Sequence, residues 1–217
     1  MKNIAVVLSG CGHQDGAEVT ETVAAIVTLS QLGAAINYFA PNMEVNEVNH
    51  LVGKETGQKR NLLVEGARIA RGKIKDLKEL SEKHFDGLVF PGGKGASLNL
   101  CDFAAKGAKA SLHPEVSRIV MEFHRESKPI AAICIAPVLL ALALGKKNVE
   151  VTIGNDKKTS VEIEKLGAKH IDCPVDDFIT DRNHKVVTTP AYMYGNAKPY
   201  DVFLGIQKTI REFYEMA

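Results

Sequence analysis

Short apolar runs alternate along this chain with stretches in which apolar residues recur every three or four positions. A short apolar run bounded by glycine, proline or polar residues is typical of a buried strand. On this basis we predict strands at Ile4–Leu8, Ala35–Ala40, Phe85–Phe90, Ile130–Ile133, Val149–Ile153, Phe178–Thr180 and Lys185–Thr189. The polar residues 42–61 follow neither pattern, so we expect an excursion from the domain there.

Between these runs the apolar residues have the spacing of helices. The sets that predict a helix are Val19, Val23, Ile26 and Val27, then Leu62 and Ile69, then Val116, Ile119, Val120 and Phe123, and finally the segment Asp201–Met216. Gly33 and Gly72 follow the first two sets, and glycine commonly ends a helix. Strands that alternate with helices predict an α/β fold, with a mostly parallel sheet and helices on both of its faces.

Composition limits the class of protein. The chain has 217 residues, of which 45% are hydrophobic, and this suits one α/β domain over residues 1–217. The net charge is only +1 and tryptophan is absent, so we expect no nucleic-acid partner. No apolar run reaches the ~18–20 residues of a membrane span, so we expect no membrane partner. The 4 cysteines do not form a disulfide framework in a chain of this length, which favours a reducing, cytoplasmic location.

Cys134 is the strongest candidate for a catalytic residue. It follows the predicted strand Ile130–Ile133 directly, and Ile135–Leu142 predicts a helix that begins within a few residues. A strand that turns this sharply into a helix presents one side chain on the turn, as in a nucleophile elbow. The positive end of the helix favours thiolate over thiol, so we expect a lowered pKa. The alternative is a buried structural cysteine.

Three loops that follow predicted strands are candidates to build a site around Cys134. They are Ser9–Glu18, Pro91–Ala96 and the turn at Cys134 itself, and the carboxyl ends of parallel strands meet at one edge of a sheet. The backbone N–H groups of Gly92, Gly93 and Ile135 are expected to bind a substrate oxygen, with Gly12 of the first loop nearby. The alternative for Gly92 and Gly93 is an ordinary tight turn.

A reactive thiol needs a neighbouring acid or base. Glu18 is our first choice, with Asp15 and Glu21 as rivals, although a carboxylate in a first helical turn is also common for its favourable interaction with the helix dipole. His170 is the candidate base, or else a structural histidine at a strand. His13 is expected to line the pocket. We expect no metal, because no cluster has the spacing of a zinc site.

Several motifs together resemble the ThiJ/PfpI group of the class I glutamine amidotransferase-like superfamily. The motifs that match this group are Phe90-Pro91-Gly92-Gly93, Ala131-Ala132-Ile133-Cys134-Ile135-Ala136-Pro137 and Glu18 after the first strand. A closer resemblance is to the ElbB family, the lycopene-enhancing or isoprenoid-biosynthesis glyoxalase-like proteins. Its motifs here are Leu8-Ser9-Gly10-Cys11-Gly12, Asp15-Gly16-Ala17-Glu18, Asn61-Leu62-Leu63-Val64-Glu65, Ala67-Arg68-Ile69-Ala70-Arg71-Gly72, Cys173-Pro174-Val175-Asp176-Asp177 and Val187-Thr188-Thr189-Pro190-Ala191-Tyr192-Met193.

The resemblance implies a flavodoxin-like three-layer sandwich, a Cys134 nucleophile beside Glu18, and a homodimer. It also implies a weak, cofactor-free and glutathione-independent glyoxalase activity. The chain departs from the wider superfamily in having Ala136 where glycine is usual, and in lacking the downstream His-x-Glu of true amidotransferases.

We therefore expect an enzyme that converts small dicarbonyls, glyoxal or methylglyoxal, into hydroxy acids through a hemithioacetal on Cys134. One alternative is a non-enzymatic sensor of oxidants or electrophiles, or an isoprenoid-pathway accessory protein, with Cys11 as a possible second thiol. A third hypothesis is a hydrolase or amide-transfer subunit, for which the sequence supplies no secure triad histidine.

Overall fold

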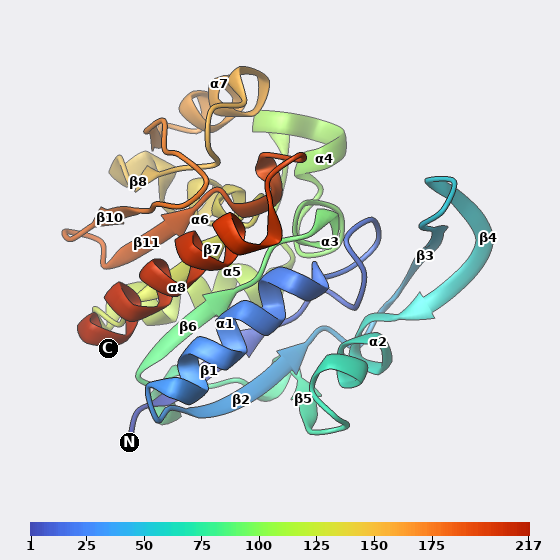
Figure 1. Cartoon of the computed structure of the whole chain (residues 1–217), viewed down its shortest axis with the longest axis horizontal. Helices are drawn as coiled ribbons and strands as arrows, with labels where there is room; N and C mark the ends of the chain where they lie inside the picture. The colour runs from blue at the N-terminus through green and yellow to red at the C-terminus, as the bar shows by residue number, and fades with distance from the viewer.

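One seven-stranded sheet organises the chain in the computed structural model, which describes residues 1–217. Its order is β10–β11–β7–β6–β1–β2–β5 (Figure 1). The strands are β1 (Asn3–Val7), β2 (Ala35–Ala40), β5 (Ile74–Asp76), β6 (Gly87–Phe90), β7 (Ile130–Ile133), β10 (Ile179–Asp181) and β11 (Val186–Thr189). Only β10 is antiparallel to its neighbour. The predicted α/β fold with a mostly parallel sheet is confirmed.

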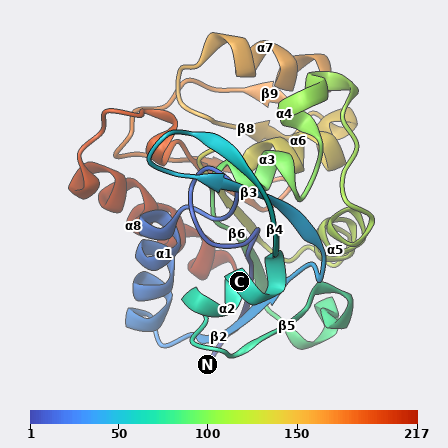
Figure 2. The same ribbon diagram turned by 90° about the vertical axis from the view of Figure 1, so that its right-hand side faces the viewer.

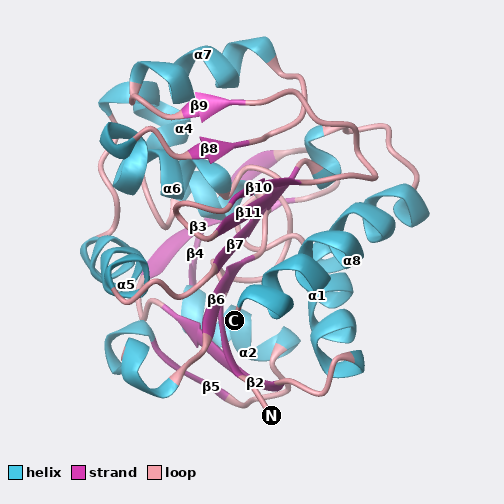
Figure 3. Ribbon diagram, turned by 90° about the vertical axis from the view of Figure 1, so that its left-hand side faces the viewer, coloured by secondary structure: helices cyan, strands magenta, loops and turns pink.

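Helices cover both faces of this sheet, as Figure 3 shows. The main helices are α1 (Val19–Gln31), α5 (Pro114–Arg125), α6 (Pro137–Leu144) and α8 (Pro199–Met216), and the shorter ones are α2 (Leu62–Ile69), α3 (Lys94–Leu98), α4 (Phe103–Lys106) and α7 (Lys157–Lys165). Successive side chains of β1 point to opposite faces, so Ile4 packs with α1 and α8, and Ala5 packs with α5 and α6. None of the helices combines the length and the apolar character that crossing a membrane requires.

The polar excursion predicted at residues 42–61 is an antiparallel hairpin of β3 (Glu44–Asn49) and β4 (Lys54–Asn61). It lies outside the main sheet, as Figures 1 and 2 show. Most of its side chains are exposed. Apolar and polar residues alternate in a strand when one of its faces is buried, and because neither face of this hairpin is buried, its sequence lacks that pattern. A second small ladder joins β8 (Glu150–Val151) to β9 (Lys169–His170).

Helix α1 is present as predicted, but its valines face away from the core. Val19, Val23 and Val27 are 42%, 45% and 53% exposed. The buried face instead consists of Glu21, Thr22, Ala24, Ala25, Thr28 and Leu29. Small residues on this face allow α1 to lie closely beside α8 and over the sheet. As a result, the Glu21 carboxyl enters the interior of the molecule.

Candidate active site at the β7 elbow

Cys134 lies on the sharp turn after β7, as predicted. Its φ is 63°, a left-handed conformation that costs a non-glycine residue energy and is frequent at functional sites. Its N–H donates to the Thr189 carbonyl at 2.9 Å, which fixes the turn to the end of β11. The residue is only 7% exposed, and it lines a cavity rather than an open surface.

Gly92 allows the thiol and a carboxyl to approach each other. A β-carbon at Gly92 would overlap both the Cβ of Cys134 and Oε2 of Glu21. The Gly92 carbonyl also accepts from the N–H of Glu18 at 2.9 Å, so the loop after β6 is held against the start of α1. Gly92, which was predicted to bind substrate, therefore has a packing role: because it has no side chain, Cys134 and Glu21 can lie next to each other.

We expect Gly92→Ala to lower both activity and stability. Movement of the Glu21 side chain alone cannot make room for the added methyl group, because its other contacts are the Cβ of Cys134 and the carbonyl oxygen of Ile133. Overpacking of this kind costs about 1–3 kcal/mol. Urea denaturation and dicarbonyl turnover measure the two effects. Gly195→Ala is the matched control, because nothing lies near the position of its added methyl group. Unchanged turnover in Gly92→Ala would contradict the close approach.

Glu21 is the carboxyl beside the sulfur. It is fully buried, and its Oε1 accepts from the Tyr192 N–H at 3.1 Å while Oε2 has no hydrogen-bond partner. Burial, followed by the nearby charge of Glu18, raises the pKa of Glu21 to about 8. A buried carboxyl with an open acceptor and a raised pKa holds its proton near neutral pH and can transfer it.

The thiol of Cys134 does not have the lowered pKa that its position after a strand predicts. Burial, and then the charge of Glu21, raise the pKa of Cys134, while the N–H groups of Gly93 and Ile135 lower it. The predicted lowering of the pKa was wrong because it took account of the positive end of the helix but not of the burial of the thiol. Since two buried anions cannot lie side by side cheaply, the pair carries at most one negative charge.

The donors expected to bind an oxyanion are thus found at the sulfur. The N–H groups of Gly93 and Ile135 both act on Cys134, where they lower the pKa of the thiol. Gly93 has a φ of 94°, and a β-carbon there would strike the backbone of Gly16 and Glu18, so only glycine fits. These two donors stabilise negative charge on sulfur and lie next to any oxygen on a carbon bonded to it.

Glu18 lies at the start of the first helix, where the sequence placed it. It is the N-cap of α1, where its Oε2 accepts from the Glu21 N–H at 2.6 Å, and it also lines the cavity that contains Cys134. The two carboxyls therefore divide the site, with Glu21 behind the sulfur and Glu18 in the wall of the cavity. Glu21, named only as a rival from the sequence, is the residue that the fold places against Cys134.

Two other candidates lie away from the sulfur. His170 is in β9, its Nε2 accepts from the Ile153 N–H at 3.2 Å, and it is not among the residues that line the Cys134 cavity. It has the structural role that was its alternative. Gly12 is also outside the cavity lining; a β-carbon there would strike the His50 ring, so Gly12 makes room for the β3–β4 hairpin.

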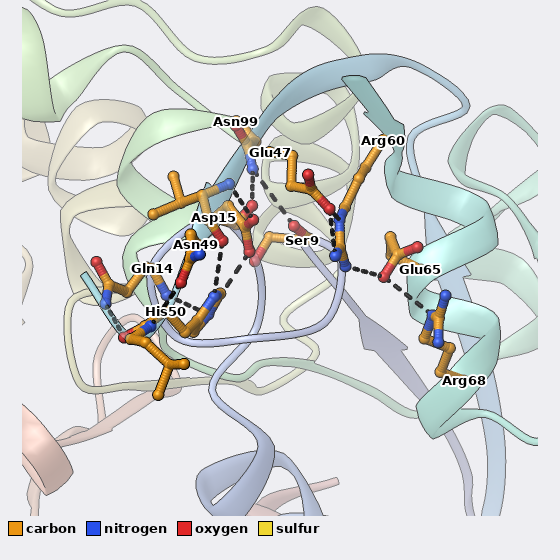
Figure 4. Close-up of polar contacts among 12 residues, drawn as sticks. Ser9, Gln14, Asp15, Glu47, Asn49, His50, Arg60, Glu65, Arg68 and Asn99 are labelled. Carbon is orange, nitrogen blue, oxygen red and sulfur yellow. Dashed lines mark hydrogen bonds and ion pairs between the residues drawn. The ribbon is translucent and has the colours of Figure 1, made fainter. Parts of the chain in front are cut away.

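Asp15 belongs to the polar network that holds this hairpin, shown in Figure 4. Asp15 Oδ2 accepts from the Val48 N–H at 2.8 Å, and its Oδ1 lies 3.7 Å from His50 Nε2. Burial, and then the charge of Glu65, raise the pKa of Cys11. A raised pKa lowers the thiolate fraction, which does not favour Cys11 as a second redox-active thiol. The rival carboxylate Asp15 has no contact with Cys134.

The Cys134 sulfur opens into a cavity of about 760 Å³. Its lining residues are His13, Glu18, Gly93, Lys94, Ser97, Phe103, Ala104, Ala105, Lys106, Gly107, Cys134, Ile135, Asp156, Lys158, Thr159, Glu162, Tyr192 and Met193. His13 is here as predicted. Tyr192, which was quoted in a motif but given no role, lines the cavity and also donates its N–H to Glu21. No histidine forms a hydrogen bond or ion pair with Cys134.

Known proteins are similar in sequence over most or all of this chain. The human protein "Glutamine amidotransferase-like class 1 domain-containing protein 3, mitochondrial" is 43% identical over 98% of this chain and 82% of its own. The rat "ES1 protein homolog, mitochondrial" is 43% identical over 88% of this chain and 75% of its own. The crystal structure of an "isoprenoid biosynthesis protein with amidotransferase-like domain" from Ehrlichia chaffeensis has 37% identity and a TM-score of 0.93, over 100% of this chain and 99% of its own.

These relatives correct one expectation. Cytoplasmic location, inferred from the cysteine count, is wrong on this comparison, because the similar human, rat and zebrafish proteins are mitochondrial. The cysteine count indicates only a reducing environment, which more than one compartment provides.

The family model "DJ-1/PfpI family" matches residues 11–194, which include both partners of the Cys134–Glu21 pair. Because this family model covers most of the chain, the chain belongs to the DJ-1/PfpI family.

Proposed function

We propose that this protein is a glutathione-independent glyoxalase that converts 2-oxoaldehydes such as glyoxal and methylglyoxal into 2-hydroxy acids on Cys134. The observation that carries the proposal is the pairing of a buried thiol with a buried carboxyl at the wall of a solvent-connected cavity. A thiol supplies the nucleophile and a carboxyl with a pKa of about 8 supplies the proton carrier, so the reaction needs no cofactor.

In the first step the sulfur of Cys134 bonds to the aldehyde carbon. In molecules in which Glu21 is ionised, the thiol proton passes to Glu21, which then gives it to the aldehyde oxygen, and a hemithioacetal results. While negative charge is on that oxygen, the N–H groups of Gly93 and Ile135 lie next to it and stabilise it. Preorganised donors of this kind, rather than the thiol alone, distinguish an active site from a reactive cysteine.

The second step moves hydrogen between the two carbons. A base removes the proton from the carbon bonded to sulfur, an enediol forms, and the proton returns on the neighbouring carbon to give a thioester of the hydroxy acid. Glu18 lines the cavity and uses only Oε2 in its cap, so its Oε1 is free to carry this proton. Water then cleaves the carbon–sulfur bond, releases the hydroxy acid and restores the thiol. The net reaction adds one water and requires no oxidant.

The finer identity of the protein is part of the same proposal. Its motifs resemble those of ElbB proteins, and a relative with 37% identity is called an isoprenoid biosynthesis protein, so we propose membership of that branch. The homodimer implied by the resemblance is likewise a proposal, which sedimentation velocity measures directly.

The two alternatives have less support from the geometry. A peroxide sensor requires an accessible thiolate, whereas Cys134 is 7% exposed and burial raises its pKa. Glutamine hydrolysis by a Cys-His-Glu arrangement requires a histidine on the sulfur, and His113 instead caps α5 by accepting from the Glu115 N–H at 3.2 Å.

The experiment that tests the proposal is the detection of glycolate formed from glyoxal in the absence of glutathione. Production of many equivalents per protein molecule supports an enzyme. A single equivalent that remains bound as an adduct on Cys134 would contradict turnover and support the sensor.

We expect Glu18→Gln to fold normally and to lower turnover by about a hundredfold, the lower range of general acid–base catalysis. Glutamine keeps an oxygen to accept from the Glu21 N–H but cannot carry a proton. Exchange of the C1 hydrogen with deuterated solvent, followed by NMR of the product, reports on the same step. Full activity in this variant would remove Glu18 from the proton transfer.

A further inference from the structure

The cavity at Cys134 is much larger than the dicarbonyls considered above. Taking about 30 Å³ for each non-hydrogen atom, the volume of a water molecule in the liquid, methylglyoxal occupies roughly 150 Å³. The cavity measures about 760 Å³. Pockets of about 300–1,000 Å³ are typical of sites that enclose ligands much larger than methylglyoxal. Methylglyoxal bonded to Cys134 would therefore leave most of this space unoccupied.

The walls beyond the sulfur come from elements outside the elbow. Lys94 begins α3, directly after the Gly93 donor, and Lys158 lies in the first turn of α7. Figure 2 shows α7 and α4 at the same end of the molecule as α3, and α7 packs against the turn Gly107–Lys109 that follows α4. A ligand held at Cys134 therefore shares the cavity with both lysines, which come from different helices.

Some of the charged residues in this cavity have hydrogen-bond or salt-bridge partners and others have none. Of the acidic residues in the lining, Asp156 caps α7 by accepting from the Thr159 N–H at 2.7 Å, and Glu162 pairs with Lys165 at 2.6 Å. Glu18 caps α1 in the same way. Among the basic residues, Lys106 is paired with Asp102.

Lys94 and Lys158 form no salt bridge and no side-chain hydrogen bond, unlike the third lysine of the lining. Two ammonium groups without salt-bridge partners in one cavity attract an anionic group in the ligand.

From this arrangement we infer that the substrate is a 2-oxoaldehyde that carries a phosphate or carboxylate group at its far end, bound by Lys94 and Lys158. The inference deepens the proposed function, since the carbonyl end reacts at Cys134 as described above. The lysines act on binding and not on the chemical step. A phosphate-bearing three-carbon 2-oxoaldehyde gives 3-phosphoglycerate when one water is added across it, so that acid is a stable probe of the product complex.

The test is the binding of 3-phosphoglycerate and of glycerate to the wild-type protein, measured by calorimetry. We expect 3-phosphoglycerate to bind at least about tenfold more tightly than glycerate. Lys94→Met and Lys158→Met should each weaken 3-phosphoglycerate binding about tenfold and leave glycerate unchanged. Lys146→Met is the matched control, because Lys146 is exposed, unpaired and outside the cavity. Equal affinity for the two acids, or no loss in either lysine variant, would overturn the inference.

Binding and turnover separate this inference from the proposed function. Lysine-dependent binding of 3-phosphoglycerate by a protein that converts no dicarbonyl would support the anion site and contradict the glyoxalase. Turnover of methylglyoxal without lysine-dependent anion binding would support the glyoxalase and contradict the anion site. When both hold, the phosphorylated 2-oxoaldehyde should have a lower KM than its unphosphorylated form, and the two lysine variants should raise that KM with little change in kcat.

Discussion

Cys134→Ser is expected to abolish dicarbonyl turnover, with a loss on the order of a thousandfold or more. Serine has nearly the shape of cysteine, but its hydroxyl ionises far less readily, and neither Glu21 nor the N–H groups of Gly93 and Ile135 compensate for that. The measurement is glycolate formation from glyoxal by the wild type and the variant side by side, with thermal unfolding of both to confirm the fold.

The matched control is Cys173→Ser. Cys173 is also buried, and its pKa is raised to about 12 by burial and then by the charge of Asp177, but it lies outside the Cys134 cavity. A general effect of removing a buried thiol would therefore affect both variants. Retained turnover in Cys134→Ser would refute the nucleophile, and an equal loss in Cys173→Ser would show that the effect is structural.

The positions of most strands along the chain and the position of the elbow could be predicted from the sequence because both depend on local signals. Ile130–Ile133 is apolar at every position, as a strand buried on both faces requires, and Cys134 follows it before a proline that begins α6. The β3–β4 hairpin had no such signal. Its exposed strands have no buried face, and Leu51 at its tip is 96% exposed.

The face of α1 could not be predicted from apolar periodicity, because the periodic residues are the exposed ones. A second signal was present in the same segment: Ala24, Ala25 and Thr28 are small residues that permit close packing, and Glu21 is on their side of the helix. Glu18 and Glu21 are one turn apart, so their roles depend on how α1 is rotated about its own axis. That rotation is set by contacts with α8 and the sheet, which involve residues far away in the sequence.

We expect Glu21→Gln to make the protein more stable at neutral pH and less active. Folding raises the pKa of Glu21 from 4.5 to about 8, so between these values the folded protein holds a proton that the unfolded chain releases. The free energy of unfolding of the wild type therefore falls as pH rises through this window, by about 1.4 kcal/mol per unit. Glutamine does not titrate, so the variant does not lose this stability. Between pH 5 and 7 we therefore expect the difference in the free energy of unfolding between the variant and the wild type to grow by roughly 2–3 kcal/mol in favour of the variant.

Activity should change in the opposite direction. The reactive form of the Cys134–Glu21 pair carries one negative charge, and its fraction rises with pH up to about 8. We expect wild-type turnover to rise over this range, and Glu21→Gln to lose that rise together with about a hundredfold in rate. Urea denaturation and turnover from pH 5 to 9 measure the two effects. Glu18→Gln, which leaves Glu21 in place, is the control that should keep a pH dependence, shifted to lower pH because the charge of Glu18 helps to raise the pKa of Glu21. If Glu21→Gln and the wild type lose stability in parallel with rising pH, Glu21 is not the buried proton carrier, and the carboxyl that assists Cys134 must be Glu18.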